Sequence, residues 1–157
     1  MPTIHLTTFI AAPPQVVFDL SRHIGLHKIS QQDNKEEAVS GVTSGLIKKD
    51  ESVTWKAKHL FKTRLMTVKI TEMIVPDFFE DVMTGGDFAM YEHKHHFKQI
   101  ENGTIMIDEL LFESPYGFIG KLFNRLYLAG YMKKLVEKRN KTIKEYAEST
   151  KWEALLN

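Results

Sequence analysis

The hydrophobic period of the sequence switches to a helical one after Pro115, and this switch limits the folds that the chain can adopt. After Pro115 the chain runs to about Glu148 without another proline, and its apolar residues recur at helical spacing. Several lysines fall largely on the opposite side. The residues near the apolar face are Phe118, Leu122, Leu126, Ala129, Met132, Val136 and Ile143. The sequence therefore predicts one long C-terminal helix with a greasy face.

Before this helix the chain contains repeated short segments with the pattern of β-strands. Turn residues separate most of these segments, and Asn102-Gly103 is the sharpest hairpin signal. Strands joined by such tight turns must be antiparallel. The predicted strands cover residues 36–41, 52–61, 63–75, 78–84, 88–100 and 104–113.

The first thirty residues predict one more strand and two short helices. Residues 3–10 alternate in part and are rich in β-branched side chains, which favours a strand. Pro13 and Pro14 end this strand and suit the first turn of a helix over residues 14–21. A second short helix is expected over residues 24–30.

A sheet with one apolar face and a helix with one apolar stripe bury these surfaces against each other. We therefore predict a two-layer α+β architecture, with an antiparallel sheet of six to seven strands packed against the long C-terminal helix. No linker or repeat interrupts the chain, so residues 1–157 are predicted to form a single domain.

Composition excludes several classes of function. The 157 residues include 21 Lys and Arg against 20 Asp and Glu, so the net charge is +1 and we expect no nucleic-acid partner. The absence of cysteine rules out disulfides, thiolate metal sites and cysteine nucleophiles. No apolar run is long enough to span a membrane and no secretory signal is recognised, so we expect a cytoplasmic protein.

Four sequence segments, together with the order of elements, resemble a known superfamily. The segments are IAAPPQVVFDL, the strand around Trp55, FFEDVMTGGDFAMYEHKHHF, and NGTIMIDELLFESPYG. The chain resembles the START-like or Bet v 1-like (SRPBCC) superfamily, also called the polyketide cyclase/dehydrase and lipid-transport group, and within it the small bacterial members. The residues that carry this narrower likeness are Phe79, Asp81, Gly86, Phe88, His93, His95, Phe97, Gly103, Thr104, Asp108 and Glu109.

The resemblance implies a helix-grip fold, in which a curved antiparallel sheet wraps around the long C-terminal helix and encloses an internal cavity. Members of the superfamily bind lipids, sterols, hormones or polyketides, and some cyclise or dehydrate aromatic precursors. Because one fold serves many functions, the likeness alone does not select an activity.

The strand over residues 88–100 carries the candidate catalytic side chains. Alternation places Tyr91, His93, His95 and Phe97 on one face, which Phe97 indicates to be the inner one. His93 and His95 could exchange protons with a ligand, or they could be bound to a carboxylate for a purely structural purpose.

Further positions are predicted to line the cavity. Trp55 and His59 alternate with lysines and so face inward, whereas Asp108 and Glu109 are neighbours of which only one can be internal. The predicted ligand-binding residues are Trp55, His59, Met66, Asp81, Tyr91, His93, His95, Phe97, Asp108, Phe123 and Tyr127.

The pair His93 and His95 raises the alternative of a metal site. Two histidines in the pattern H-x-H could share an ion if His59, Asp81, Asp108 or Glu109 supplied a third ligand. The cupin-type motif is not met, because Asp87 occupies the required glycine position. We therefore expect no metal and no cofactor.

The sequence supports three hypotheses of different classes. The first is the binding of a small hydrophobic ligand, a lipid or an aromatic, polyketide-like molecule, in an internal cavity. The second is a cyclase or dehydratase that uses His93 or His95 as general acid or base. The third is a non-catalytic interaction module with a filled cavity. Surplus apolar residues after Pro115 also leave a possible homodimer contact open.

Overall fold

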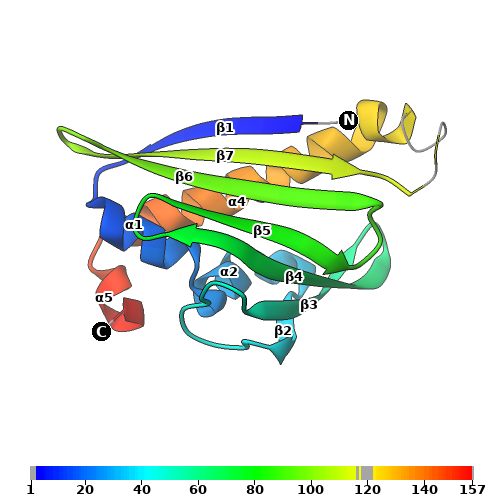
Figure 1. Cartoon of the computed structure of the whole chain (residues 1–157), viewed down its shortest axis with the longest axis horizontal. Helices are drawn as coiled ribbons and strands as arrows, with labels where there is room; N and C mark the ends of the chain where they lie inside the picture. Colours follow the sequence, from blue (N-terminus) through cyan, green and yellow to red (C-terminus); the bar gives the residue numbers. More distant parts are fainter. Residues whose placement is uncertain (1–2, 116, 118–121, 157) are drawn as a thin grey trace.

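Seven antiparallel strands form one sheet in the order β1-β7-β6-β5-β4-β3-β2. The computed structural model describes residues 3–115, 117 and 122–156. The strands are β1 (Thr3–Ile10), β2 (Glu37–Gly41), β3 (Ser52–His59), β4 (Lys62–Ile74), β5 (Phe78–Gly85), β6 (Met90–Ile100) and β7 (Gly103–Glu113). The chain thus returns β7 to pair with β1, which places the first and last strands side by side (Figure 1).

The helices lie where the chain leaves the sheet. They are α1 (Pro14–Ser21), α2 (Ile24–Ser30), η1 (Gln32–Asn34), the π-helical η2 (Asn124–Leu128), α4 (Ala129–Ala147) and α5 (Lys151–Leu156). Pro14 begins α1, as its fixed φ allows, and the side chain of His23 caps α2 by accepting from the Leu26 N–H at 3.1 Å. No helix among the described residues is long and apolar enough to cross a lipid bilayer.

The long helix α4 covers one face of the sheet, and α1 and α2 pack against it (Figure 1). One apolar cluster joins α1 to the inner face of the sheet through Phe18, Phe79 and Phe97. A second cluster joins β7 to α4 through Phe112 and Met132. The predicted α+β helix-grip architecture is confirmed, and the sheet has seven strands, within the predicted six to seven.

The sequence prediction is wrong at the turn between β3 and β4. We expected the strand to continue through residue 61, but Leu60 and Phe61 have φ values of 53° and 67° and form the turn. Neither residue is a usual turn former, so the pattern gave no signal. Phe61 is 98% exposed instead of facing inward.

The C-terminal helix also departs from a single regular element. Its early part is a π-helical turn over η2, and α5 is a separate short helix after Ala147. Within α4, Met132, Val136 and Ile143 are buried as predicted. Phe118, expected on the same face, lies outside the described residues.

Candidate functional site: a cavity with a polar cluster

A cavity of about 510 Å³ lies between the inner face of the sheet and the helices. Its lining comes from α2, from β3 to β6 and from α4, and most of the lining side chains are apolar. Trp55 and Met66 contribute from β3 and β4, while Met132 and Val136 contribute from α4. The sheet and helix therefore enclose a space large enough for a small organic molecule.

Most of the predicted ligand-binding residues meet at this cavity. Those that line it are Trp55, His59, Met66, Asp81, Tyr91, His93, His95 and Phe123. They come from β3, β4, β5, β6 and the segment before η2, so they converge only through the fold. Their part in ligand binding remains a prediction.

Three predicted residues lie elsewhere. Phe97 is 4% exposed and packs edge-on against Phe18, so it belongs to the core beyond the cavity. Asp108 is fully buried behind His93, and its backbone neighbour Glu109 faces outward, which answers which of the two is internal. Tyr127 is 53% exposed on the π-helical turn and stacks on Phe123.

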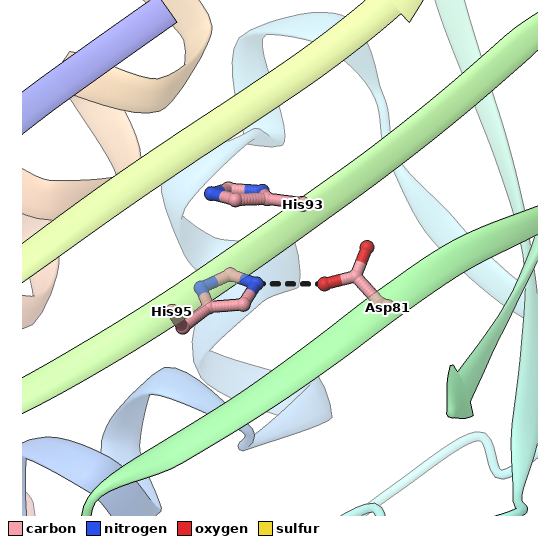
Figure 2. A group of neighbouring side chains, drawn as sticks. All are labelled: Asp81, His93 and His95. Carbon is pink, nitrogen blue, oxygen red and sulfur yellow. Dashed lines mark hydrogen bonds and ion pairs between the residues drawn. The ribbon is translucent and has the colours of Figure 1, made fainter. Parts of the chain in front are cut away.

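One side of the cavity carries a polar group of three residues, Asp81, His93 and His95 (Figure 2). The Nε2 atom of His95 lies 2.7 Å from Oδ2 of Asp81, and both histidines are at least 95% buried. The two imidazole rings are stacked with centroids 3.8 Å apart. Strand pairing explains the arrangement, because β5 and β6 run side by side with Asp81 opposite His93.

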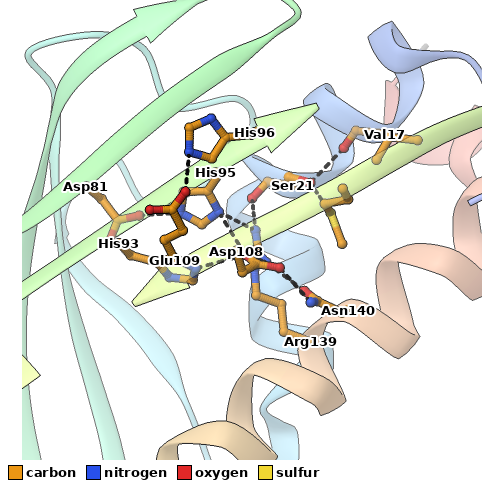
Figure 3. A network of polar contacts seen from close by, with 11 residues as sticks. Val17, Ser21, Asp81, His93, His95, His96, Asp108, Glu109, Arg139 and Asn140 are labelled. Atoms are coloured by element: carbon orange, nitrogen blue, oxygen red, sulfur yellow. Dashed lines mark hydrogen bonds and ion pairs between the residues drawn. The ribbon is translucent and has the colours of Figure 1, made fainter. Parts of the chain in front are cut away.

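A second layer of polar residues supports this group from behind (Figure 3). Asp108 accepts hydrogen bonds from His93 Nε2 at 2.8 Å, from Asn140 Nδ2 at 2.6 Å and from Arg139 Nη1 at 3.3 Å. Arg139 Nη2 lies 3.2 Å from His95 Nδ1. A buried carboxylate is tolerated when it is paired and hydrogen-bonded in this way.

Burial and pairing fix the charges of the cluster. Burial, reinforced by the proximity of His95, lowers the pKa of His93 to about 4, so this imidazole is neutral at pH 7. Burial alone would raise the pKa of Asp108, but the hydrogen bond from His93, the proximity of His95 at 3.4 Å and the charge of Arg139 lower it well below its usual value. The pKa of Asp81 is lowered in the same manner, chiefly by its hydrogen bond with His95.

The hydrogen bonds also determine which ring nitrogens carry protons. An arginine only donates, so the Nδ1 atom of His95 must accept from Arg139 and its Nε2–H donates to Asp81. The ionised Asp108 can only accept, so the Nε2 atom of His93 carries the proton and its Nδ1 atom is unprotonated.

Asp81, His93 and His95 are also a group with the spacing of a metal site among the described residues. Their ligand atoms lie within 4.8 Å of one another. However, the Nε2 atom of His95 could bind a metal only if its proton moved to Nδ1, which faces the donor group of Arg139. This arrangement disfavours a cation, and the absence of a metal remains a prediction.

Two polar contacts lie further along the cavity lining. His59 Nδ1 is 2.6 Å from the Tyr131 hydroxyl, and burial lowers the pKa of His59. Arg64 donates to Asp87 at 2.6 Å and to the His59 carbonyl at 3.2 Å. These side chains tie the β3–β4 hairpin to the C-terminal helix and to the β5–β6 connection.

Trp55 belongs to another contact that joins β3 to α2. Its ring lies 4.6 Å from the ring of His27, whose Nε2 atom is 2.6 Å from Oε1 of Glu36. His27 and Glu36 both line the cavity, and Glu36 is buried. The indole therefore packs against the helical layer and lines the cavity at once.

Sequence reasoning missed Arg139 and Asn140, which hold the polar cluster in place. Their signal was their position: they lie three and four residues after Val136, on the face that turns toward the sheet. Glu36, His27 and Tyr131 were also missed, and only their contacts across the fold identify them.

Comparison with known proteins bears on the fold alone. No protein-family model matches the chain, and no curated protein matches it in sequence. A crystal structure of TTHA0849 from Thermus thermophilus is similar with a TM-score of 0.75 and 21% identity, covering 93% of this chain and 97% of that one.

Two further structures connect the fold to named groups. A START superfamily protein from Mycobacterium smegmatis is similar with a TM-score of 0.70 and 12% identity, over 91% of this chain and 97% of its own. Major latex-like protein 151 from Panax ginseng gives a TM-score of 0.69 and 12% identity, over 94% and 97%. The chain therefore has the START-like, Bet v 1-like (SRPBCC) fold, as the sequence predicted.

Proposed function

We propose that this protein binds a small, largely apolar molecule, a lipid or an aromatic, polyketide-like compound, in its internal cavity. The observation that carries the proposal is the 510 Å³ cavity with mostly apolar lining and one polar cluster. Binding gains about 25 cal/mol for each Å² of apolar surface that the ligand buries, and the polar groups fix its orientation. The START and major latex-like neighbours support a ligand-binding fold in general terms.

The proposal is tested by native mass spectrometry of freshly purified protein. We expect an added mass that disappears on denaturation and is reduced in Ala57→Phe, because Ala57 is buried on the cavity wall. Ala89→Phe is the matched control, since it adds the same side chain at an exposed turn. Failure to retain or take up any lipid or aromatic compound, in the unchanged protein, would count against a carrier.

A cyclase or dehydratase activity is the second candidate, and the carboxylate-bound histidines on the cavity lining favour it. His93 and His95 could exchange a proton with a bound aromatic substrate. Changing both to glutamine separates the hypotheses: turnover of a polyketide-like substrate should fall sharply if they are catalytic. An unchanged rate would remove them from the mechanism.

The third hypothesis, a non-catalytic interaction module, requires a cavity that side chains fill. The volume of the cavity disfavours it. Exposed apolar side chains near η2, namely Leu122, Leu126 and Tyr127, are the feature that supports a possible homodimer. The homodimer and the cytoplasmic location stay predictions.

A further inference from the structure

The polar cluster offers the cavity hydrogen-bond acceptors. Asp81 uses Oδ2 to accept from His95, and its Oδ1 accepts nothing from the described residues. His93 donates through Nε2 to Asp108, which leaves the lone pair of its Nδ1 without a partner in the described part of the chain. Asp81 is ionised and both residues line the cavity. A ligand group placed here would meet two acceptors, one of them charged.

The positive charge nearest these acceptors is already fully engaged. Arg139 donates through Nη1 to Asp108 and Asn140, at 3.3 and 2.8 Å. Through Nη2 it donates to His95 and to the Ser21 carbonyl, at 3.2 and 3.4 Å. These four contacts use both terminal nitrogens of the guanidinium, so it cannot turn toward a ligand without leaving Asp108 short of a partner.

The other two arginines that line the cavity are also paired with aspartates. Arg22 donates to Asp19 from Nε and Nη2, at 3.0 and 2.8 Å, and Arg64 donates to Asp87 at 2.6 Å. His93 is neutral at pH 7, as its lowered pKa shows. Among the described lining residues, each arginine is already paired with an aspartate, which disfavours an anionic ligand.

The pKa of Tyr91 reflects its burial first and the nearby charges second. Burial raises this pKa far above the usual value, the charge of Asp81 raises it further, Arg139 opposes this, and Glu36 and Asp108 add smaller increases. The Tyr91 hydroxyl is a neutral donor, which is too little to offset the cost of burying a carboxylate. Geometry and charge thus both favour a ligand that donates.

We infer that the Asp81–His93 side of the cavity binds the hydrogen-bond-donating group of an otherwise apolar ligand, a hydroxyl or a protonated amine, and selects against a carboxylate. This inference rests on the proposed ligand-binding function and narrows its chemistry. It disfavours free fatty acids and favours phenols, alcohols and amines, because Oδ1 of Asp81 and the unprotonated Nδ1 of His93 only accept. A hydroxyl has one O–H to donate to either atom, and a protonated amine has enough N–H groups for both.

A matched set of fluorescent pyrene derivatives tests the inference on the unmodified protein. Pyrenemethanol, pyrenemethylamine, pyrenecarboxylate and methylpyrene share one apolar body and differ in the attached group. Fluorescence titration at pH 7 should give dissociation constants at least about tenfold lower for the alcohol or the amine than for the carboxylate. A tighter amine would assign the preference to charge, and a tighter alcohol would assign it to a neutral donor.

Two other results would overturn the inference, and they differ in what else they overturn. Carboxylate binding as tight as that of the alcohol and the amine would remove the selectivity while leaving hydrophobic ligand binding intact. Binding of none of the four compounds, methylpyrene included, would remove the proposed function and the inference with it.

A variant locates the selectivity. Asp81→Asn keeps an acceptor for His95 but removes the charge and adds an N–H donor, so the preference over the carboxylate should shrink by about tenfold. Glu109→Gln is the control, because it removes the same charge from the outer face of the sheet. An unaltered preference in Asp81→Asn would contradict the assignment, and the ligand series on the unmodified protein decides the matter if this variant does not fold.

Discussion

Strands β6 and β7 carry a histidine–carboxylate pair on each of their two faces, and the comparison shows that a similar distance does not mean a similar contribution to stability. On the inner face His93 lies 2.8 Å from Asp108, with side-chain exposures of 5% and 0%. On the outer face His96 lies 3.1 Å from Glu109, with exposures of 39% and 44%. The distances are nearly equal, but only the inner pair has been removed from water. Its loss must therefore be far more costly than that of the outer pair.

The largest expected effect comes from removing the inner carboxylate. Asp108→Ala leaves Arg139, His93 and Asn140 without their common acceptor, and we expect a loss of about 3–5 kcal/mol in the free energy of unfolding. Glu109→Ala is the matched control and should change it by less than about 0.5 kcal/mol. Urea unfolding measures both, and equal losses would mean that burial does not distinguish the two faces.

The next largest effect is a loss of folding stability at acidic pH, which we expect the buried His93 on the inner face to cause. The pKa of His93 is about 4 in the folded protein, whereas an unfolded histidine has a pKa of 6.5. As pH falls from 6.5 toward 4, His93 becomes protonated in the unfolded chain but stays neutral in the folded protein. Stability should therefore decline through this window by up to about 3 kcal/mol.

Unfolding midpoints measured across this pH range, in the unchanged protein and in two variants, check this expectation. His93→Gln should flatten the decline, and His5→Gln should leave it, because His5 is exposed on β1. The lowered pKa values of Asp81 and Asp108 act in the same direction but below about pH 4. A decline of the same steepness in all three proteins would show that His93 does not titrate as described.

The smallest of the three effects concerns the support of the inner pair. Asn140→Ala removes the 2.6 Å hydrogen bond to Asp108, and the expected cost in unfolding free energy is about 2 kcal/mol. Lys141→Ala, one residue further along and exposed, should cost less than about 0.5 kcal/mol. Similar costs at both positions would place the stabilisation of Asp108 elsewhere.

The sequence predicted the inner face well because strand alternation is a local property. Tyr91, His93 and His95 face the cavity as their spacing indicates, and the first three elements match their predicted bounds. The cavity itself was expected from the resemblance to the START-like superfamily. That the residues lining this cavity bind a ligand is still a prediction.

The partners of these histidines could not be predicted, because they come from strands and helices far apart in the chain. Nothing local indicates that Arg139 would reach Asp108, which lies 31 residues away. Leu60 and Phe61 form a turn without any turn residue, so pairing of the flanking strands must impose it. In both cases tertiary contacts outweigh local sequence preference.

The engagement of Arg139 has a consequence for how such a cavity can evolve. One guanidinium holds Asp108, His95 and Asn140 together. Any change that released it to bind an acidic ligand would first lower the stability of the folded protein. The evolution of binding to acidic ligands would therefore require a second, compensating substitution at position 108 in the same lineage. Selection at position 139 thus acts on the stability of the fold before it acts on the choice of ligand.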